Sequence, residues 1–153
     1  MKWIATLLVL PAFALATPSP DTAAKNSLTP SDWRYVAQKV AAGDGAWLGA
    51  VPDLAVKADR KQADQLEEAL ATALPINPRG VLAVLHRLDA GSWPHMSGTN
   101  IVCTRMVVQP GKAASEYYTA ARWALLSEPG GAECLWNLEG IWEEVNQQKN
   151  NAE

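Results

Sequence analysis

Apolar residues recur at spacings of three and four along most of the chain, which is the pattern of amphipathic α-helices with one buried face. Glycine or proline follows most of these stripes, and both residues stop helices. A stretch around Pro52, rich in glycine and apolar residues, predicts a turn that leads into a shorter helix. The pattern therefore predicts an all-α fold. The stripes fall within residues 30–42, 59–74, 78–88, 113–126 and 132–147.

The stretch LPINPRGVLAVL, residues 74–85, joins two of these helices through very few residues. Pro75 ends the first helix, Asn77 is placed to cap the second, and Pro78 suits its first turn. Helices joined so closely fold back on each other as an αα-hairpin. The stretch SEPGG, residues 127–131, predicts a second hairpin near the C-terminus. We therefore expect two or more αα-hairpins packed as a small helical array.

The least helical part of the chain runs from Asp89 to Gly111, and we expect function to reside there because loops carry most binding residues. Its first half exposes Trp93 and His95 among small turn-forming residues, which suits contact with a partner protein. The alternative is that Trp93 plugs the open end of the helical stack while His95 is merely solvated. Its second half, Ile101 to Val108, is rich in β-branched residues and predicts an irregular or short extended segment.

The N-terminus has the order of features of an export signal. Lys2 is followed by an apolar run, and Ala14-Leu15-Ala16 has the small, large, small pattern after which signal peptidase cuts. The apolar run is too short to span a bilayer, so we expect no stable membrane insertion after cleavage and a periplasmic or secreted protein. The predicted organisation is a signal peptide over 1–16, a flexible tail over 17–27, one helical domain over 28–148 and a disordered tail over 149–153.

Two cysteines remain after cleavage, Cys103 and Cys134, and an oxidising compartment favours a disulfide bond between them. No C-x-x-C motif is present to suggest a redox site. The full chain has 13 basic and 16 acidic side chains, and loss of Lys2 with the signal makes the mature protein more acidic still. The basic residues are scattered, so there is no footprint for a phosphate backbone and we expect no nucleic-acid partner.

Two histidines, His86 and His95, are with Asp89 the candidates for a small hydrolase or a metal site. On a helix, Asp89 would follow His86 by close to one turn, where its carboxylate could orient the imidazole ring. A metal site would need a third ligand, and a hydrolase would need a nucleophile, whereas Ser92 and Ser97 have no nucleophile-elbow motif around them. We therefore assign no catalytic residue, no metal ligand and no cofactor.

Four features together resemble small exported proteobacterial proteins of unknown function. They are the export signal, the helix that ends before NPRGVLAVL, the glycine-rich approach to Cys103 and the second cysteine near the last helix. The resemblance covers most of the mature chain through short motifs, and it implies an all-helical periplasmic fold with a cysteine pair without implying a reaction. Size, export and helical content are also similar, at the level of the fold, to periplasmic immunity proteins that neutralise wall-degrading effectors of type VI secretion.

These observations favour a non-catalytic protein-binding module of an inhibitor or immunity type, whose partner is another periplasmic protein or an incoming one. Trp93 and His95 are the predicted partner-binding residues. Two alternatives stay open. One is a small hydrolase or metal-binding protein that uses His86, Asp89 and His95, and the other is a structural factor that maintains the cell envelope.

Overall fold

The computed structural model describes residues 16–152, and every regular element within this range is a helix, as the all-α prediction requires. The signal peptide predicted over 1–16 lies, except for Ala16, outside the described residues. No helix in the described part of the chain is long and apolar enough to cross a membrane. The helices are α1 (Pro20–Lys25), α2 (Pro30–Ala41), α3 (Gly45–Ala55), α4 (Arg60–Ala73), α5 (Pro78–Asp89), α6 (Thr99–Val102), α7 (Lys112–Leu126) and α8 (Ala132–Ala152).

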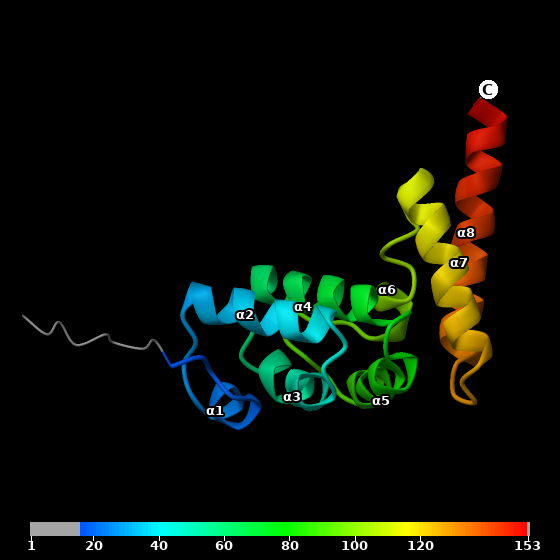
Figure 1. Cartoon of the computed structure of the whole chain (residues 1–153). Coiled ribbons are helices and arrows are strands. Elements are labelled where there is room, and N and C mark those ends of the chain that lie inside the picture. Colours follow the sequence, from blue (N-terminus) through cyan, green and yellow to red (C-terminus); the bar gives the residue numbers. More distant parts are fainter. Residues whose placement is uncertain (1–15, 153) are drawn as a thin grey trace, which may run out of the picture.

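Helices α1 to α5 are stacked in two layers, because each packs most extensively against a helix two places away in the chain. One layer holds α1, α3 and α5, and the other holds α2 and α4 (Figure 1). Consecutive helices thus fold back on each other from layer to layer, an arrangement typical of helical repeats in which each unit covers its neighbour's apolar face. Fully buried side chains between the layers include Val36, Val40, Leu48, Val51, Leu54, Leu66, Leu70, Leu74 and Val81.

Helices α7 and α8 form an antiparallel hairpin that stands across one end of the layered helices (Figure 1). The two helices pack on each other, and α8 reaches the rest of the fold through α6, which also contacts α4 and α5. The start of α7 and the end of α8 project beyond the layers (Figure 1). The hairpin is therefore an appendage of the layered array that has its own exposed faces.

The joint between α4 and α5 is organised by Asn77. Its Oδ1 accepts a hydrogen bond from Gly80 N at 3.0 Å, which caps α5 as predicted. Its Nδ2 donates to the carbonyl oxygen of Gly43 at 2.9 Å, just after α2 ends. Gly43 has φ 77°, and a Cβ added there would lie 3.1 Å from Asn77 Cβ, so both conformation and space favour glycine. Asn77 therefore fixes the start of α5 relative to the end of α2.

The flexible tail predicted over 17–27 is instead largely helical, because α1 occupies Pro20–Lys25 and packs on α3. Ala23 is fully buried. At the end of α1, Lys57 Nζ donates to the carbonyl oxygens of Ala23 and Asn26, the latter at 2.6 Å. Loss of water around Nζ lowers the pKa of Lys57. Lys57, two residues beyond the end of α3, therefore stabilises the C-terminal end of a helix that is too short to be stable alone.

The disordered tail predicted over 149–153 is also helical as far as Ala152, where α8 ends. Extending an existing helix costs much less free energy than starting one, so the polar end of α8 follows its packed beginning.

Of the two forms predicted for Ile101 to Val108, the segment takes the irregular one and not the extended one. Its first residues belong to α6, and turns follow. Val102, Cys103 and Val107 are buried there, so the β-branched residues fill the core from a helix and turns instead of pairing in a sheet. Burial has overridden their preference for extended backbone.

Replacing Asn77 tests the joint. In Asn77→Ala we expect the free energy of unfolding to fall by about 2 kcal/mol, because a helix cap and a partly buried hydrogen bond are both lost. Asn77→Asp keeps the acceptor that caps α5 but loses the donor to Gly43, so its loss should be about 1 kcal/mol. Urea denaturation followed by circular dichroism measures both. Equal losses in the two variants would show that the bridge to Gly43 contributes nothing.

Candidate functional site

The loop between α5 and α6 carries the two predicted partner-binding residues, and the structure treats them differently. Trp93 is half-buried, and its Nε1 donates a hydrogen bond to the carbonyl oxygen of Leu88 at 2.8 Å. Its ring lies so close to Gly91 that a Cβ there would come within 2.9 Å of it. His95 is exposed. Part of the Trp93 side chain is therefore packed against the fold, whereas His95 is exposed. The two residues do not form a freely exposed pair.

The same loop is fastened to α4 by a buried carboxylate. Glu67 Oε1 accepts a hydrogen bond from Ser97 N at 2.7 Å, and Glu67 Oε2 lies 3.7 Å from an Arg105 guanidinium nitrogen. Burial raises the pKa of Glu67, and the Ser97 N–H and the Arg105 charge oppose that rise. Met96, which precedes Ser97 in the loop, is buried. The loop therefore has fixed attachments on both sides of His95.

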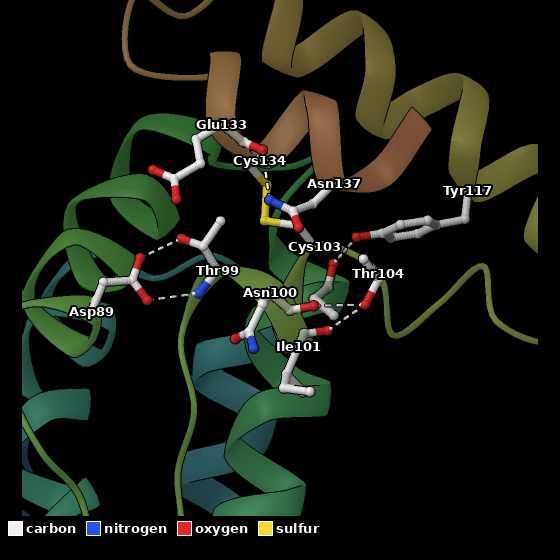
Figure 2. The surroundings of a disulfide bond; sticks show 11 residues. Asp89, Thr99, Asn100, Ile101, Cys103, Thr104, Tyr117, Glu133, Cys134 and Asn137 are labelled. Atoms are coloured by element: carbon white, nitrogen blue, oxygen red, sulfur yellow. Dashed lines mark hydrogen bonds between the residues drawn. A yellow bond between two sulfur atoms is a disulfide. The ribbon is translucent and has the colours of Figure 1, made fainter. Parts of the chain in front are cut away.

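Asp89, the proposed partner of His86, has another role. Its Oδ1 accepts a hydrogen bond from Thr99 N at 3.0 Å, and its Oδ2 accepts one from Thr99 Oγ1 at 2.5 Å, so it caps α6 from outside that helix (Figure 2). Gly98 allows this approach, because a Cβ there would lie only 1.8 Å from Asp89 Oδ1. His86 is exposed on α5. In the described range, no group of three His, Cys, Asp or Glu residues is placed to hold a metal ion.

The disulfide joins Cys103, just after α6, to Cys134 in the first turn of α8 (Figure 2). Their Cα atoms are 5.4 Å apart, and both residues are buried. The cysteine pair predicted from the sequence therefore lies in the core, where an external thiol has little access to the sulfur atoms. Beside it, the Tyr117 hydroxyl donates to the carbonyl oxygen of Ala71 at 2.7 Å, and burial raises the pKa of Tyr117.

The hairpin beyond this tether carries the most exposed aromatic side chains of the described chain. Trp123 on α7 is 66% exposed and Trp136 on α8 is 78% exposed. Our sequence interpretation overlooked both, although the signal was present. Trp136 lies two residues before Leu138, a member of the buried stripe, and residues two apart on a helix point in different directions. The periodicity alone would have predicted that Trp136 lies on the solvent-exposed side of the helix.

Two hollows flank these tryptophans. The first, of about 550 Å³, lies between the helices and is lined by aromatic, hydroxyl and charged side chains of Tyr118, Thr119, Arg122, Trp123, Glu139 and Glu143. In it Arg122 Nε donates to Glu139 Oε1 at 2.7 Å, which raises the pKa of Arg122. The ring of Tyr118 stacks on that of Trp142 with 4.5 Å between centroids. These contacts hold α7 against α8.

The second hollow lies on the outer side of α8. It has a volume of about 300 Å³ and is lined by Glu133, Trp136, Asn137, Gly140 and Ile141. Trp136 forms one wall, and the missing side chain of Gly140 leaves the space beside it open. The hollow is shallow, with a large aromatic side chain next to a gap and a carboxylate in its lining.

No protein-family model matches the chain, and neither a curated protein nor a solved structure matches it. Function is therefore inferred from the geometry of these surfaces.

Substitution of Trp93 separates its two possible roles. We expect Trp93→Ala to lower the free energy of unfolding by about 2 kcal/mol, because it removes a half-buried ring. Trp93→Phe should lose about 1 kcal/mol, since it keeps most of the ring but not the N–H donor to Leu88. Thermal melts of both variants measure this. An unchanged midpoint for Trp93→Ala would show that the ring is free for a partner and does not support the fold.

Removal of the disulfide tests the tether. The bond closes a sequence separation of 31 residues. On the chain-entropy model its loss in Cys103→Ala/Cys134→Ala should lower the free energy of unfolding by roughly 3 to 4 kcal/mol. Cys134→Ala alone should lose a similar amount, because one cysteine closes no loop. Urea denaturation gives these values, and a loss below about 1 kcal/mol in the double variant would contradict the assignment.

Proposed function

We propose that this protein is an exported, non-catalytic protein-binding module of an inhibitor or immunity type, and that its binding surface is the α7–α8 hairpin. The observation that carries the proposal is the pair of exposed tryptophans, Trp123 and Trp136, on the hairpin at one end of the layered helices. Tryptophan is the side chain most enriched among residues that dominate binding energy at protein interfaces. Its exposure to water in the free protein is unfavourable, and a partner that covers it removes that cost.

Two features support a periplasmic or secreted location. The first is the charge, apolar run and A-x-A order at the N-terminus. The second is the buried disulfide between Cys103 and Cys134, since such bonds form and persist in oxidising compartments. A partner is then another protein of the envelope or one that enters it from outside.

Binding explains more of the structure than the hydrolase or metal-site alternative does. Both oxygens of Asp89 accept hydrogen bonds from Thr99, so its carboxylate already serves the fold. His95 and the exposed part of Trp93 remain in the proposal as a second contact on the α5–α6 loop.

Reconstitution of the complex tests this function. The mature protein should capture a second protein after cross-linking in the envelope, and the purified pair should bind with a measurable Kd. Trp123→Ala/Trp136→Ala should weaken that Kd by about thirtyfold or more, because truncation of an interface hot spot typically costs at least about 2 kcal/mol. Ile76→Ala, which removes another exposed apolar side chain from a joint far along the chain, is the matched control and should bind normally.

An inhibitor or immunity role adds that the partner's own activity falls on binding. Absence of any complex with the wild-type protein would contradict the proposed function. Hydrolysis of a substrate that is lost in His86→Ala or His95→Ala would favour the enzymatic alternative instead.

A further inference from the structure

The outer face of α8 is a single line of exposed residues. Glu133, Trp136, Gly140, Glu143 and Gln147 follow one another at spacings of three and four, so they share one side of the helix. That side is opposite the one on which Leu138 is buried. The line is continuous over about four turns, and within it an aromatic side chain and a glycine lie between two carboxylates.

The centre of this line is unfavourable for the isolated protein. Trp136 is 78% exposed. Gly140 lies within α8, where glycine is among the poorest helix formers, and a Cβ there would have no neighbour within 4 Å. The fold therefore gives no reason for a glycine at this position. The space it leaves is part of the hollow beside Trp136, so a protruding ring and a gap of about 300 Å³ adjoin on one face.

The two carboxylates determine which occupant this face fits. Consider a second copy of α8 packed antiparallel, related by a two-fold axis that crosses the helix at the level of residue 138. Trp136 of each copy would then lie opposite Gly140 of the other, so that each ring would face a gap. The same axis would place Glu133 opposite Glu143, and no basic side chain stands in this line to offset the repulsion. Arg122 lines the same hollow as Glu143, but its guanidinium is already paired with Glu139. The charges therefore disfavour a second copy and favour an occupant with basic residues.

Neither carboxylate is held by an ion pair within the described part of the chain, although Glu133 lies in the first turn of α8, where its charge suits the helix dipole. Among the described residues, Glu133 and Glu143 take part in none of the ion pairs, which involve Glu67, Glu68, Glu116, Glu128, Glu139 and Asp64. They are ten residues apart, or about 15 Å along the helix axis. A helix laid along α8 presents side chains at the same separation, and grooves beside helices commonly receive amphipathic helices.

We propose that the outer face of α8 binds a basic amphipathic helix of the partner protein. An apolar side chain of that helix enters the hollow between Trp136 and Gly140, and lysine or arginine residues at its two ends pair with Glu133 and Glu143. This inference rests on the proposed protein-binding function, and it names the residues and the chemistry of the contact.

A peptide probe tests it. The probe is a labelled helical peptide of about sixteen residues, with leucine and alanine on one face and lysines at both ends, and its counterpart has glutamates in place of the lysines. By fluorescence anisotropy the lysine peptide should bind the full mature protein, and the glutamate peptide should not. Binding should weaken as salt is added, because the end contacts are exposed ion pairs.

Variants assign the contact to this face. Trp136→Ala and Gly140→Leu should each weaken binding of the lysine peptide by about tenfold or more, the first by removing the ring and the second by filling the gap. Gly140→Leu should at the same time raise Tm, since leucine favours a helix more than glycine does. Gly49→Leu is the matched control, because Gly49 is also inside a helix, in α3, and its Cβ would also meet nothing.

Equal binding of the two peptides, no binding at millimolar concentration, or binding that survives both α8 variants would overturn the inference. A concentration-dependent dimer that Trp136→Ala abolishes would overturn it in favour of a second copy. The proposed function is judged separately with the captured partner. If that partner still binds Trp136→Ala and Gly140→Leu, this inference fails and the protein-binding function stands, whereas a wild-type protein that captures no partner contradicts the function itself.

Discussion

The disulfide between Cys103 and Cys134 is the constraint on which the placement of the α7–α8 hairpin depends. Besides this bond, the hairpin is joined to the layered helices by Ala121, Leu125 and Leu138, which are buried in the same hydrophobic core, by the hydrogen bond from Tyr117 to Ala71 and by an ion pair between Arg79 and Glu128. The side chain of Arg79 is 82% exposed, and such surface pairs contribute little free energy. The covalent bond therefore adds to the apolar packing between the hairpin and the array, and it fixes the start of α8 beside α6.

The disulfide can act in this way only because α6 is itself fixed. Asp89 caps α6 through Thr99, and Gly98 makes the space for that carboxylate. Cys103 follows directly at the end of the same helix. A chain of short-range constraints thus runs from α5 to the hairpin, and it leaves the outer face of α8 free. The protein as a whole is a layered helical body that carries a tethered hairpin with aromatic and acidic side chains facing solvent.

Features set by local sequence were predictable, and features set by distant contacts were not. The stripe periodicity located the longer helices, and the Asn77 cap follows from its neighbours Pro78 and Gly80. The second bond of Asn77 joins residues 34 apart, as does the contact of Lys57 with Ala23 that stabilises α1, so neither could be read along the chain. Trp93 is half-buried because its N–H donates to the carbonyl oxygen of Leu88, and this bond depends on a loop conformation that the sequence pattern does not reveal. Trp136 differs, because its position opposite the buried stripe was already present in the spacing.

Hydrogen exchange measured with the disulfide intact and then reduced tests most directly whether the hairpin is a tethered unit. On reduction, the amides of α7 and α8 should lose protection together, while those of α2 to α6 should keep theirs, because α6 is fixed by Asp89 and the layered core does not depend on the bond. Loss of protection throughout the chain, or no change in the hairpin, would contradict the account in which the disulfide fixes the hairpin to an array that is stable without it.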